Sequence, residues 1–246
     1  MANYKADVLN LAVGEVGYRE KKTAENLDSK TENAGSGNYT KYWRDLCPSG
    51  QTGAWCQCFI NWLFWKTYGE KEAKKLLGMV GEDWTYYTPT AVLYAKRNTL
   101  YHEGVEGIQE GDILYFYGYV ASEKRSRVHH VGIVYKVTAG KICTVEGNSG
   151  NGVNFREYPK DDPDLYGYIR PSYDVPPDPE ELVGWHHTAP GGWWYRYKEG
   201  RGAGTFYQNG FYFINGAWYA FDREGYLIYD IGKLAIDDKV GAIYVR

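Results

Sequence analysis

Cys56 is the residue of this sequence whose position best suits a nucleophile. It follows a loop that contains Gly53 and lies at the start of residues 55–67, WCQCFINWLFWKT, which are apolar nearly all round. Such a stretch predicts a helix buried at the centre of a domain. A thiol at a helix N-terminus meets the positive end of the helix dipole and unpaired N–H groups, which favour the thiolate and could hold a developing oxyanion. The alternative is that Cys56 is only a small core residue.

The other three cysteines give weaker indications. Cys58 lies two residues after Cys56, about 200° around a helix, so the two thiols cannot face one site and Cys58 is predicted to be core. Cys47 and Cys143 complete the set, but the spacings of the four cysteines fit no standard zinc pattern. Without an export signal, a disulfide framework is not expected.

A cysteine nucleophile needs a base, and the base needs a partner that orients it. His130 begins a strand-like stretch, and Glu146 and Asn148 lie at the end of the next one. Between the two stretches lie residues 138–140, with Gly140 in the last position. A three-residue loop that ends in a left-handed glycine is a common hairpin connection, so we expect an antiparallel pair.

The register of this hairpin decides which side chains share a face. With a three-residue loop, Val137 pairs with Lys141, and counting back places His130 opposite Asn148. Glu146 then lies on the same face as both, whereas a register shifted by one residue would turn it away. The expected loop therefore groups His130, Glu146 and Asn148. The alternative is an exposed histidine at a strand end and a solvated acid.

His129 competes with His130 for the role of base. The two residues alternate along the strand and so are expected to point to opposite faces. Only His130 shares a face with Glu146 and with Gly132, which is predicted to lie opposite that carboxylate. His130 is therefore the predicted base.

The composition excludes several classes of protein. The chain has 246 residues, a net charge of -3 and a hydrophobic fraction of 43%, which suits one average domain with a smaller second one. Nucleic-acid binding is not expected without a basic surplus. The sequence contains no run of about 20 apolar residues, so no transmembrane helix is expected. Asp7, Asn10 and Glu15 interrupt the region where an export signal needs an apolar core, so we expect synthesis in the cytoplasm without a signal peptide.

A proline-rich acidic segment divides the sequence. Four of the nine prolines lie between Pro171 and Pro179, and residues 173–183 carry four acidic and no basic side chains. This composition predicts a stiff, extended linker. We therefore expect a first domain over residues 1–172, the linker over residues 173–183 and a separate module over residues 184–246.

The first domain is expected to be α+β. Helical periodicity covers residues 4–16 and 55–67, and Pro89 begins a third helix. Strand-like stretches follow, at residues 112–117, 131–137, 141–146 and 152–158. Helices followed by strands are typical of α+β rather than alternating α/β folds.

Residues 184–246 are rich in aromatic side chains and contain a weak internal repeat. The sequence WYRY at residues 194–197 is echoed by WYAF at residues 218–221. A repeat of roughly this length, with glycine turns and aromatic strands, predicts a small all-β module of stacked hairpins, each too small to be stable alone.

Four motifs of the first domain, in this order, resemble the CHAP family of peptidoglycan hydrolases. They are WCQCFI at 55–60, GDILYF at 111–116, HVGIV at 130–134 and VEGN at 145–148. The resemblance extends over roughly residues 4–171 and implies a papain-like α+β fold of the NlpC/P60 type.

The same resemblance implies a division of roles among the site residues. Cys56 corresponds to the nucleophile, His130 to the base, Glu146 to its orienting partner and Asn148 to an auxiliary polar partner. Some family members bind calcium through an aspartate-rich loop before the cysteine. Here residues 47–55 contain no acid, so neither a metal site nor a cofactor is expected.

The C-terminal module is similar to cell-wall-binding repeats of the choline-binding type, through GAWYAFDREGY at residues 216–226. Such repeats hold ligands in aromatic cages between successive hairpins. The similarity implies that Trp185, Trp194, Trp218 and Tyr219 bind a wall polysaccharide or teichoic acid. The alternative is that these aromatic side chains only pack hairpin on hairpin.

Together these features predict a phage or prophage endolysin that cleaves an amide bond of bacterial peptidoglycan after release from the cytoplasm. CHAP-like enzymes include N-acetylmuramoyl-L-alanine amidases and peptide endopeptidases, and the sequence does not separate the two. Two other interpretations remain open, namely a non-catalytic wall-binding protein and a cysteine acyltransferase of similar fold.

Overall fold

The computed structural model describes residues 4–47, 52–174, 184–188, 192–197, 206–214, 217–228, 234–237 and 242–245. The chain separates into two compact units, Met1–Pro177 and Asp178–Arg246, which we call unit 1 and unit 2 and describe separately. Most of the predicted linker, residues 173–183, lies outside the described residues. Among the described helices, none is long and apolar enough to cross a membrane.

Helix α3 (Cys56–Tyr68) is the central helix of unit 1, and most of its side chains are buried, as its apolar sequence predicts. It ends at Gly69, whose φ of 75° lies in the left-handed region that favours glycine. Four further helices are described, and they are α1 (Tyr4–Gly14), α2 (Lys41–Leu46), α4 (Glu70–Leu76) and α5 (Thr88–Arg97).

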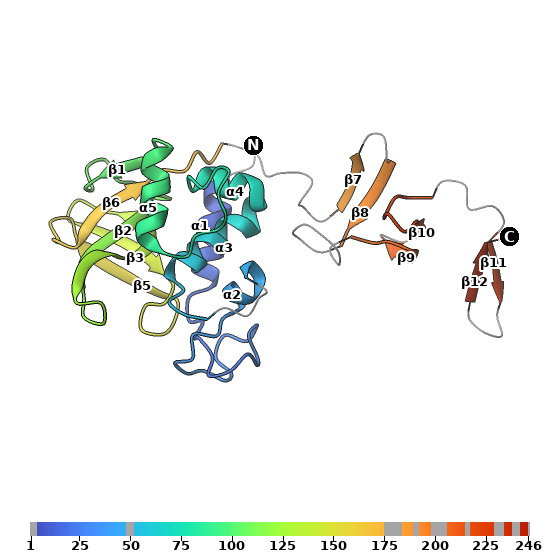
Figure 1. The fold of residues 1–246 in the computed structure, drawn as a ribbon, viewed down its shortest axis with the longest axis horizontal. Helices are drawn as coiled ribbons and strands as arrows, with labels where there is room; N and C mark the ends of the chain where they lie inside the picture. The colour runs from blue at the N-terminus through green and yellow to red at the C-terminus, as the bar shows by residue number, and fades with distance from the viewer. Residues whose placement is uncertain are drawn as a thin grey trace. The chain divides into compact units, whose positions relative to one another are not determined.

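An antiparallel six-stranded sheet forms the other part of unit 1, in the order β1-β6-β2-β3-β4-β5. The strands are β1 (Tyr101–Glu103), β2 (Ile113–Val120), β3 (Arg125–Val137), β4 (Lys141–Glu146), β5 (Asn154–Pro159) and β6 (Leu165–Ile169). Helices α1, α3 and α5 pack against β3 (Figure 1). The prediction of helices followed by strands is confirmed, but β1 and β6 were not predicted because both are too short to show a clear alternation.

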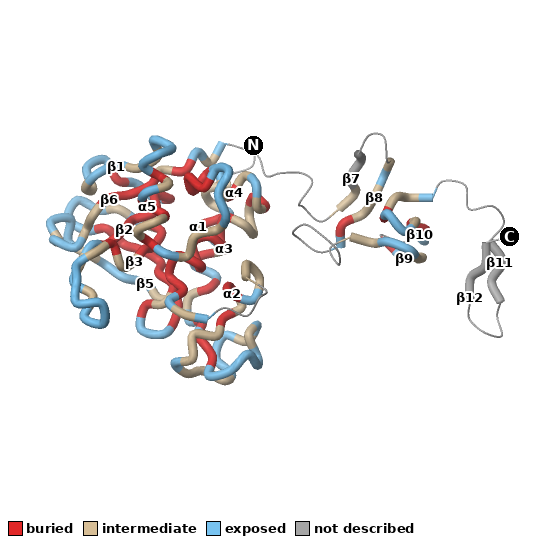
Figure 2. The backbone as a smooth tube through the Cα atoms, viewed as in Figure 1, coloured by how far each residue is buried: buried red, intermediate tan, exposed pale blue. Residues whose placement is uncertain are grey.

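The buried residues of unit 1, coloured red in Figure 2, form two apolar clusters, and alternation along the strands divides their side chains between the two. Ile113 and Tyr115 belong to the larger cluster, which includes the buried side chains of α3. Leu114 and Phe116 belong to a smaller cluster with Tyr168. Strand β2 therefore contributes to apolar cores on both of its faces, which fixes its register.

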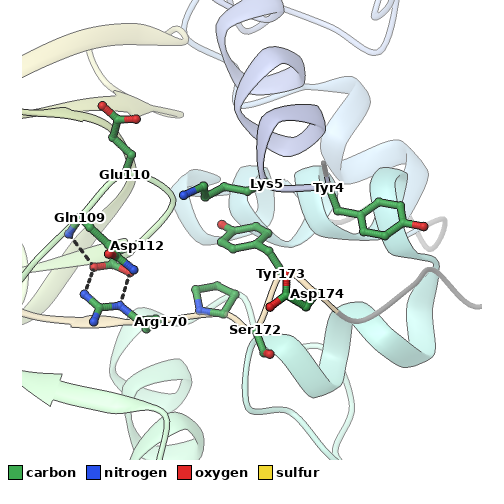
Figure 3. Close-up of a pocket in the computed structure, with 10 residues that line it drawn as sticks. Tyr4, Lys5, Gln109, Glu110, Asp112, Arg170, Ser172, Tyr173 and Asp174 are labelled. Carbon is green, nitrogen blue, oxygen red and sulfur yellow. Dashed lines mark hydrogen bonds and ion pairs between the residues drawn. The ribbon is translucent and has the colours of Figure 1, made fainter. Parts of the chain in front are cut away.

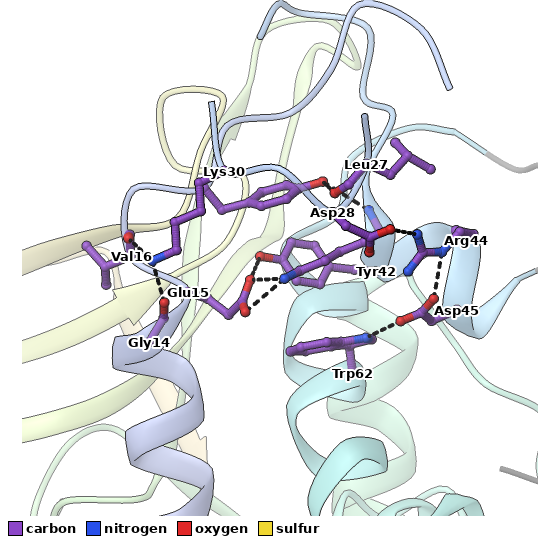
Figure 4. A network of polar contacts seen from close by, with 12 residues as sticks. Gly14, Glu15, Val16, Leu27, Asp28, Lys30, Tyr42, Arg44, Asp45 and Trp62 are labelled. Atoms are coloured by element: carbon purple, nitrogen blue, oxygen red, sulfur yellow. Dashed lines mark hydrogen bonds and ion pairs between the residues drawn. The ribbon is translucent and has the colours of Figure 1, made fainter. Parts of the chain in front are cut away.

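Polar contacts hold the N-terminal segment against α2 and α3 (Figure 4). The Glu15 carboxylate accepts hydrogen bonds from Lys41 Nζ at 2.9 Å and from the Tyr42 hydroxyl at 2.7 Å. On the other side of α2, Trp62 Nε1 donates to Asp45 Oδ2 at 2.9 Å. Buried carboxylates that accept several hydrogen bonds leave few polar groups unsatisfied, so this junction is rigid.

A second polar junction joins the end of β6 to the start of β2. The Arg170 guanidinium donates to both oxygens of the buried Asp112 carboxylate, at 3.0 and 2.8 Å. Next to it lies a pocket of about 410 Å³ between α1 and residues 170–174 (Figure 3). No cysteine or histidine lines this pocket, so it offers none of the predicted catalytic groups.

The β3–β4 hairpin differs from its predicted form in two places that compensate each other. Val137 pairs with Ile142 rather than Lys141, and Gly140 is not left-handed, so the predicted loop is wrong. The longer connection alone would shift the register by one residue. A bulge at Tyr135 shifts it back, so that Ile133 faces Val145, as the predicted register requires.

Unit 2 contains three described antiparallel hairpins, as the aromatic repeat predicts. They are β7 (Gly184–Thr188) with β8 (Gly192–Arg196), β9 (Gly210–Ile214) with β10 (Ala217–Phe221), and β11 (Leu234–Asp237) with β12 (Ala242–Val245). Aromatic contacts join the first two hairpins, because the ring centroids of Trp185 and Tyr219 lie 4.7 Å apart.

Candidate active site

Cys56 is the first residue of α3 and is 4% exposed. No side chain caps this helix N-terminus, so the first backbone N–H groups have no partner from a capping residue. The preceding residue, Trp55, is fully buried, and its Nε1 donates to Glu20 Oε2 at 2.8 Å. The nucleophile candidate is therefore held at a buried helix start, where no capping side chain competes for the first N–H groups.

His130 lies between Cys56 and Glu146. Its Nε2 is 2.7 Å from Glu146 Oε2, and the ring also hydrogen-bonds to the Cys56 thiol. Because Nε2 faces the carboxylate, Nδ1 is the ring nitrogen left for the thiol. Burial by itself lowers the pKa of His130, but the hydrogen bonds and charges of Cys56 and Glu146 outweigh it and raise the pKa to about 10.

Glu146 is 1% exposed and accepts hydrogen bonds at both oxygens. Besides the His130 contact, its Oε1 accepts from the Thr144 hydroxyl at 2.7 Å and from the Tyr158 hydroxyl at 2.9 Å. Burial raises the pKa of this carboxyl, but these hydrogen bonds and the charge of His130 bring it below its ordinary value. Glu146 thus stays ionised and fixes the ring of His130.

Thr144 and Tyr158 were not among the predicted site residues. Thr144 precedes Glu146 by two positions on β4, so strand alternation alone could have placed both on one face. Tyr158 lies on β5 and pairs with Ile142, two residues from Thr144. Its role required the β4–β5 register, which no short motif in the sequence indicates.

Gly132 allows the carboxylate to reach the histidine. A Cβ atom at Gly132 would lie 2.7 Å from Glu146 Cγ, which is closer than any real side chain permits. The predicted position of Glu146 opposite Gly132 is therefore borne out by the packing, although the predicted loop that led to it is wrong.

His129 lies beside His130, with the two ring centroids 6.4 Å apart, but the hydrogen bonds to Glu146 and Cys56 are those of His130. In the β2–β3 pair, Phe116 faces His130 and Tyr117 faces Val128, so His129 is the extra residue of a bulge. A bulge interrupts simple alternation, so the argument from opposite faces is wrong at this position. His129 instead packs over Gly118, with its Nε2 2.9 Å from where a Cβ atom of that glycine would lie.

Asn148 lies beyond the strand that carries Glu146. Strand β4 ends at Glu146, and Asn148 lies in the following turn with a left-handed φ of 56°. The predicted pairing of His130 with Asn148 is therefore wrong, because the chain has already left the sheet. Within the described part of the chain, no hydrogen bond joins the Asn148 side chain to His130.

Cys58 is fully buried, and burial raises its pKa well above the ordinary value. A thiol that stays protonated is a poor nucleophile, which agrees with its predicted place in the core. Across the described residues, no group of three or more His, Cys, Asp or Glu side chains could hold a metal ion.

Residues 48–148 match the CHAP domain family. The matched segment contains Cys56, His130 and Glu146. No curated protein matches the sequence.

Two solved structures resemble this fold, "The crystal structure of Ly7917" and "The crystal structure of Ly7917 with the hydrolyzing product of MDP". Each has 16% sequence identity and a TM-score of 0.32. The matches cover 69% and 68% of this chain. This chain spans only 62% of each of those chains.

The four aromatic residues predicted to bind the wall lie in different surroundings in unit 2. Trp185 packs against Tyr219, so this pair forms part of the contact between hairpins. Trp218 is 61% exposed and lies against Phe213. Trp194 lines a pocket of about 190 Å³, and the other lining residues are Arg196, Phe206, Glu224 and Tyr226.

Proposed function

We propose that this protein hydrolyses an amide bond of bacterial peptidoglycan through a cysteine mechanism. The observation that carries the proposal is the position of His130, which bonds to the Cys56 thiol on one side and to the ionised Glu146 on the other. This arrangement suits a thiolate–imidazolium pair, in which the nucleophile is already deprotonated. We include in this proposal a papain-like fold, in which a helix carries the nucleophile and the two strands after it carry the base and the acid.

The reaction follows from the positions of these groups. The Cys56 sulfur attacks the carbonyl carbon of the amide, and the unpaired N–H groups at the start of α3 stabilise the oxyanion. His130 gives its proton to the leaving nitrogen as the C–N bond breaks, which leaves a thioester on Cys56. A water molecule then loses a proton to His130 and attacks the thioester, and the product leaves as a carboxylate. Glu146 holds the ring in place throughout and stays ionised.

The proposal extends to unit 2, whose aromatic hairpins we assign to wall binding. Residues 184–246 have a net charge close to zero, so their attraction to an anionic polymer would be weak at physiological salt. Exposed aromatic surface such as Trp218 and the Trp194 pocket is the better candidate for contact with wall polysaccharide or teichoic acid. A wall hydrolase with such a module fits the role of an endolysin.

Mass spectrometry of peptidoglycan digested by the whole protein tests the proposal. New carboxylates and amines at one type of amide, absent from digests with Cys56→Ser, would support it. A non-catalytic wall-binding protein would release nothing. A cysteine acyltransferase would transfer the acyl group to an added amine instead of water.

A further inference from the structure

A cleft of about 440 Å³ in unit 1 lies beside the segment that precedes the nucleophile. Its walls come from α2, from residues 52–54, from residues 83–87 and from α5. Residues 52–54 lead directly into Trp55 and Cys56, so whatever lies in the cleft is next to the start of α3. None of the predicted site residues belongs to this lining, and the catalytic mechanism makes no use of it.

Aromatic side chains dominate the lining. They are Trp43, Trp84, Tyr86, Tyr87 and Tyr94. The ring centroids of Trp43 and Tyr86 lie 4.5 Å apart with an interplanar angle of 59°, so the two rings meet as adjoining walls. Trp43 is 3% exposed and forms the floor, whereas Trp84 is half-buried and offers more of its surface.

The polar ends of two of these aromatic side chains are already bonded to the protein backbone. Trp43 Nε1 donates to the Gly53 carbonyl at 3.1 Å, and the Tyr86 hydroxyl donates to the Leu46 carbonyl at 3.0 Å. The Thr85 carbonyl in turn accepts from Asn61 Nδ2 of α3 at 3.0 Å. The cleft is therefore preformed, and it presents ring faces rather than donors to a ligand.

The cleft is lined by a negatively charged side chain, and positively charged side chains lie at its border. Asp83 is the charged side chain among the lining residues. Beside the cleft, the Arg127 guanidinium lies 5.0 Å from the Tyr87 ring centroid, and Arg125 Nη2 donates to the Tyr87 hydroxyl at 2.9 Å. Both arginines pair with Glu123 outside the lining. A carboxylate inside the cleft accepts from hydroxyl and amide groups and disfavours an anionic ligand.

We propose that this cleft binds an uncharged sugar ring of the glycan, an N-acetylhexosamine, on the acyl side of the bond that is cut. The inference rests on the proposed function, because it assumes that Cys56 attacks peptidoglycan. The C–H faces of a pyranose pack on flat aromatic rings, and Asp83 accepts hydrogen bonds from its hydroxyl groups. A stem peptide carries carboxylates, which suit the positive border at Arg125 and Arg127 better than the cleft itself.

This placement specifies the class of bond. The scissile amide joins an acyl group carried by the sugar to the first amino group of the peptide. Attack by Cys56 forms a thioester on the sugar side and releases the peptide with a protonated amine. Water then converts the thioester to a carboxylate on the sugar and restores the thiol. The reaction is therefore that of an amidase rather than a peptide endopeptidase.

The test compares two soluble substrates with the full-length protein. One is a disaccharide–peptide fragment of peptidoglycan, and the other is the same peptide with an N-terminal acetyl group in place of the sugars. We expect the first to be cleaved with a kcat/KM about tenfold higher or more, mainly through KM. Trp84→Ala should remove this preference, while the rate of Cys56 alkylation by iodoacetamide stays unchanged. Tyr119→Ala, at an aromatic residue that is 66% exposed and outside the lining, is the matched control and should keep the preference.

The outcomes separate this inference from the proposed function. Loss of the sugar preference in Trp84→Ala supports the sugar subsite. An equal loss on both substrates would assign the cleft to the peptide and overturn the inference, and so would no loss on either. Cleavage between two amino acids, found by mass spectrometry, would also overturn it while leaving the cysteine mechanism intact. Full activity in Cys56→Ser would instead overturn the proposed function.

Discussion

Replacement of Glu146 by glutamine tests how the site keeps His130 protonated. The substitution conserves the shape of the side chain and an oxygen acceptor for the ring N–H, but it removes the negative charge. Because Glu146 is buried beside His130, the lost charge is not replaced by solvent. We expect the pKa of His130 to fall and the activity to fall with it.

The structure sets the size of the effect. The rise in the pKa of His130 from 6.5 to about 10 corresponds to about 5 kcal/mol of preference for the imidazolium. Burial opposes this rise, and Cys56 and Glu146 share the favourable part. Because Cys56 contributes the larger share, assigning somewhat less than half to Glu146 gives about 2 kcal/mol, which is roughly 30-fold in kcat/KM or about 1.5 pH units in the pKa of the ring.

The assay is the pH dependence of kcat/KM on soluble peptidoglycan fragments, with the His130 ring followed by NMR. In the wild type the alkaline limb should lie near the pKa of His130, about 10. In Glu146→Gln it should move to lower pH by about 1.5 units. The control is Glu157→Gln, because Glu157 pairs with Lys141 at 2.9 Å but is more than half exposed. An alkaline limb that stays in place in Glu146→Gln would refute the reasoning.

The same substitution makes a prediction about stability. The pKa of His130 is raised on folding, so its contribution to stability is complete below pH 6.5 and disappears as the pH rises through about 10. The pKa of Glu146 is lowered on folding, so its contribution is complete above 4.5 and disappears as the pH falls through the folded value. The difference in Tm between wild type and Glu146→Gln should therefore be largest between pH 4.5 and 6.5.

Three further predictions concern other parts of the molecule. Cys56→Ser should lower peptidoglycan cleavage below detection with unchanged Tm, whereas Cys58→Ala, which leaves a small cavity, should lower the free energy of unfolding by about 1–2 kcal/mol, lower the Tm with it and keep activity. The reverse pattern in a turnover and melting assay would contradict the site. His130→Ala should be inactive and His129→Ala active in the same turnover assay, and an inactive His129→Ala would mean that the contact with Glu146 has been misassigned. Trp194→Ala in the full chain should weaken sedimentation with purified walls several-fold with little dependence on salt, and unchanged binding would mean that the Trp194 pocket is only packing.

Much of the site could be predicted from the sequence because it depends on local order. The all-round apolar stretch after Gly53 determines a buried helix that starts at Cys56, since so many apolar side chains cannot remain in water. The strand that ends in Glu146 also follows from its own alternation, and its predicted bounds, 141–146, agree with β4. These features need only near neighbours along the chain.

The hairpin register shows the limit of that reasoning. A loop length was enough to propose that Glu146 faces Gly132, yet the loop is longer than expected and the bulge at Tyr135 restores the register. The burial of Val145 and Ile133 in one core selects this register, because a slip of one residue would turn Val145 away from that core and the carboxylate of Glu146 into it. The same long-range packing left Asn148 in the turn and made His129 the bulged residue.

Only the tertiary structure decided which distant residues meet around the nucleophile. Tyr158 reaches Glu146 from another strand, and Trp43 and Tyr86 meet in the aromatic cleft from segments separated by more than an entire helix. No spacing along the chain encodes these contacts, because each depends on how the sheet and the helices pack together. The sequence by itself determined the reacting groups and the local elements that carry them. Packing determined their partners, since side chains far apart in sequence are brought together by the burial of apolar surface between elements.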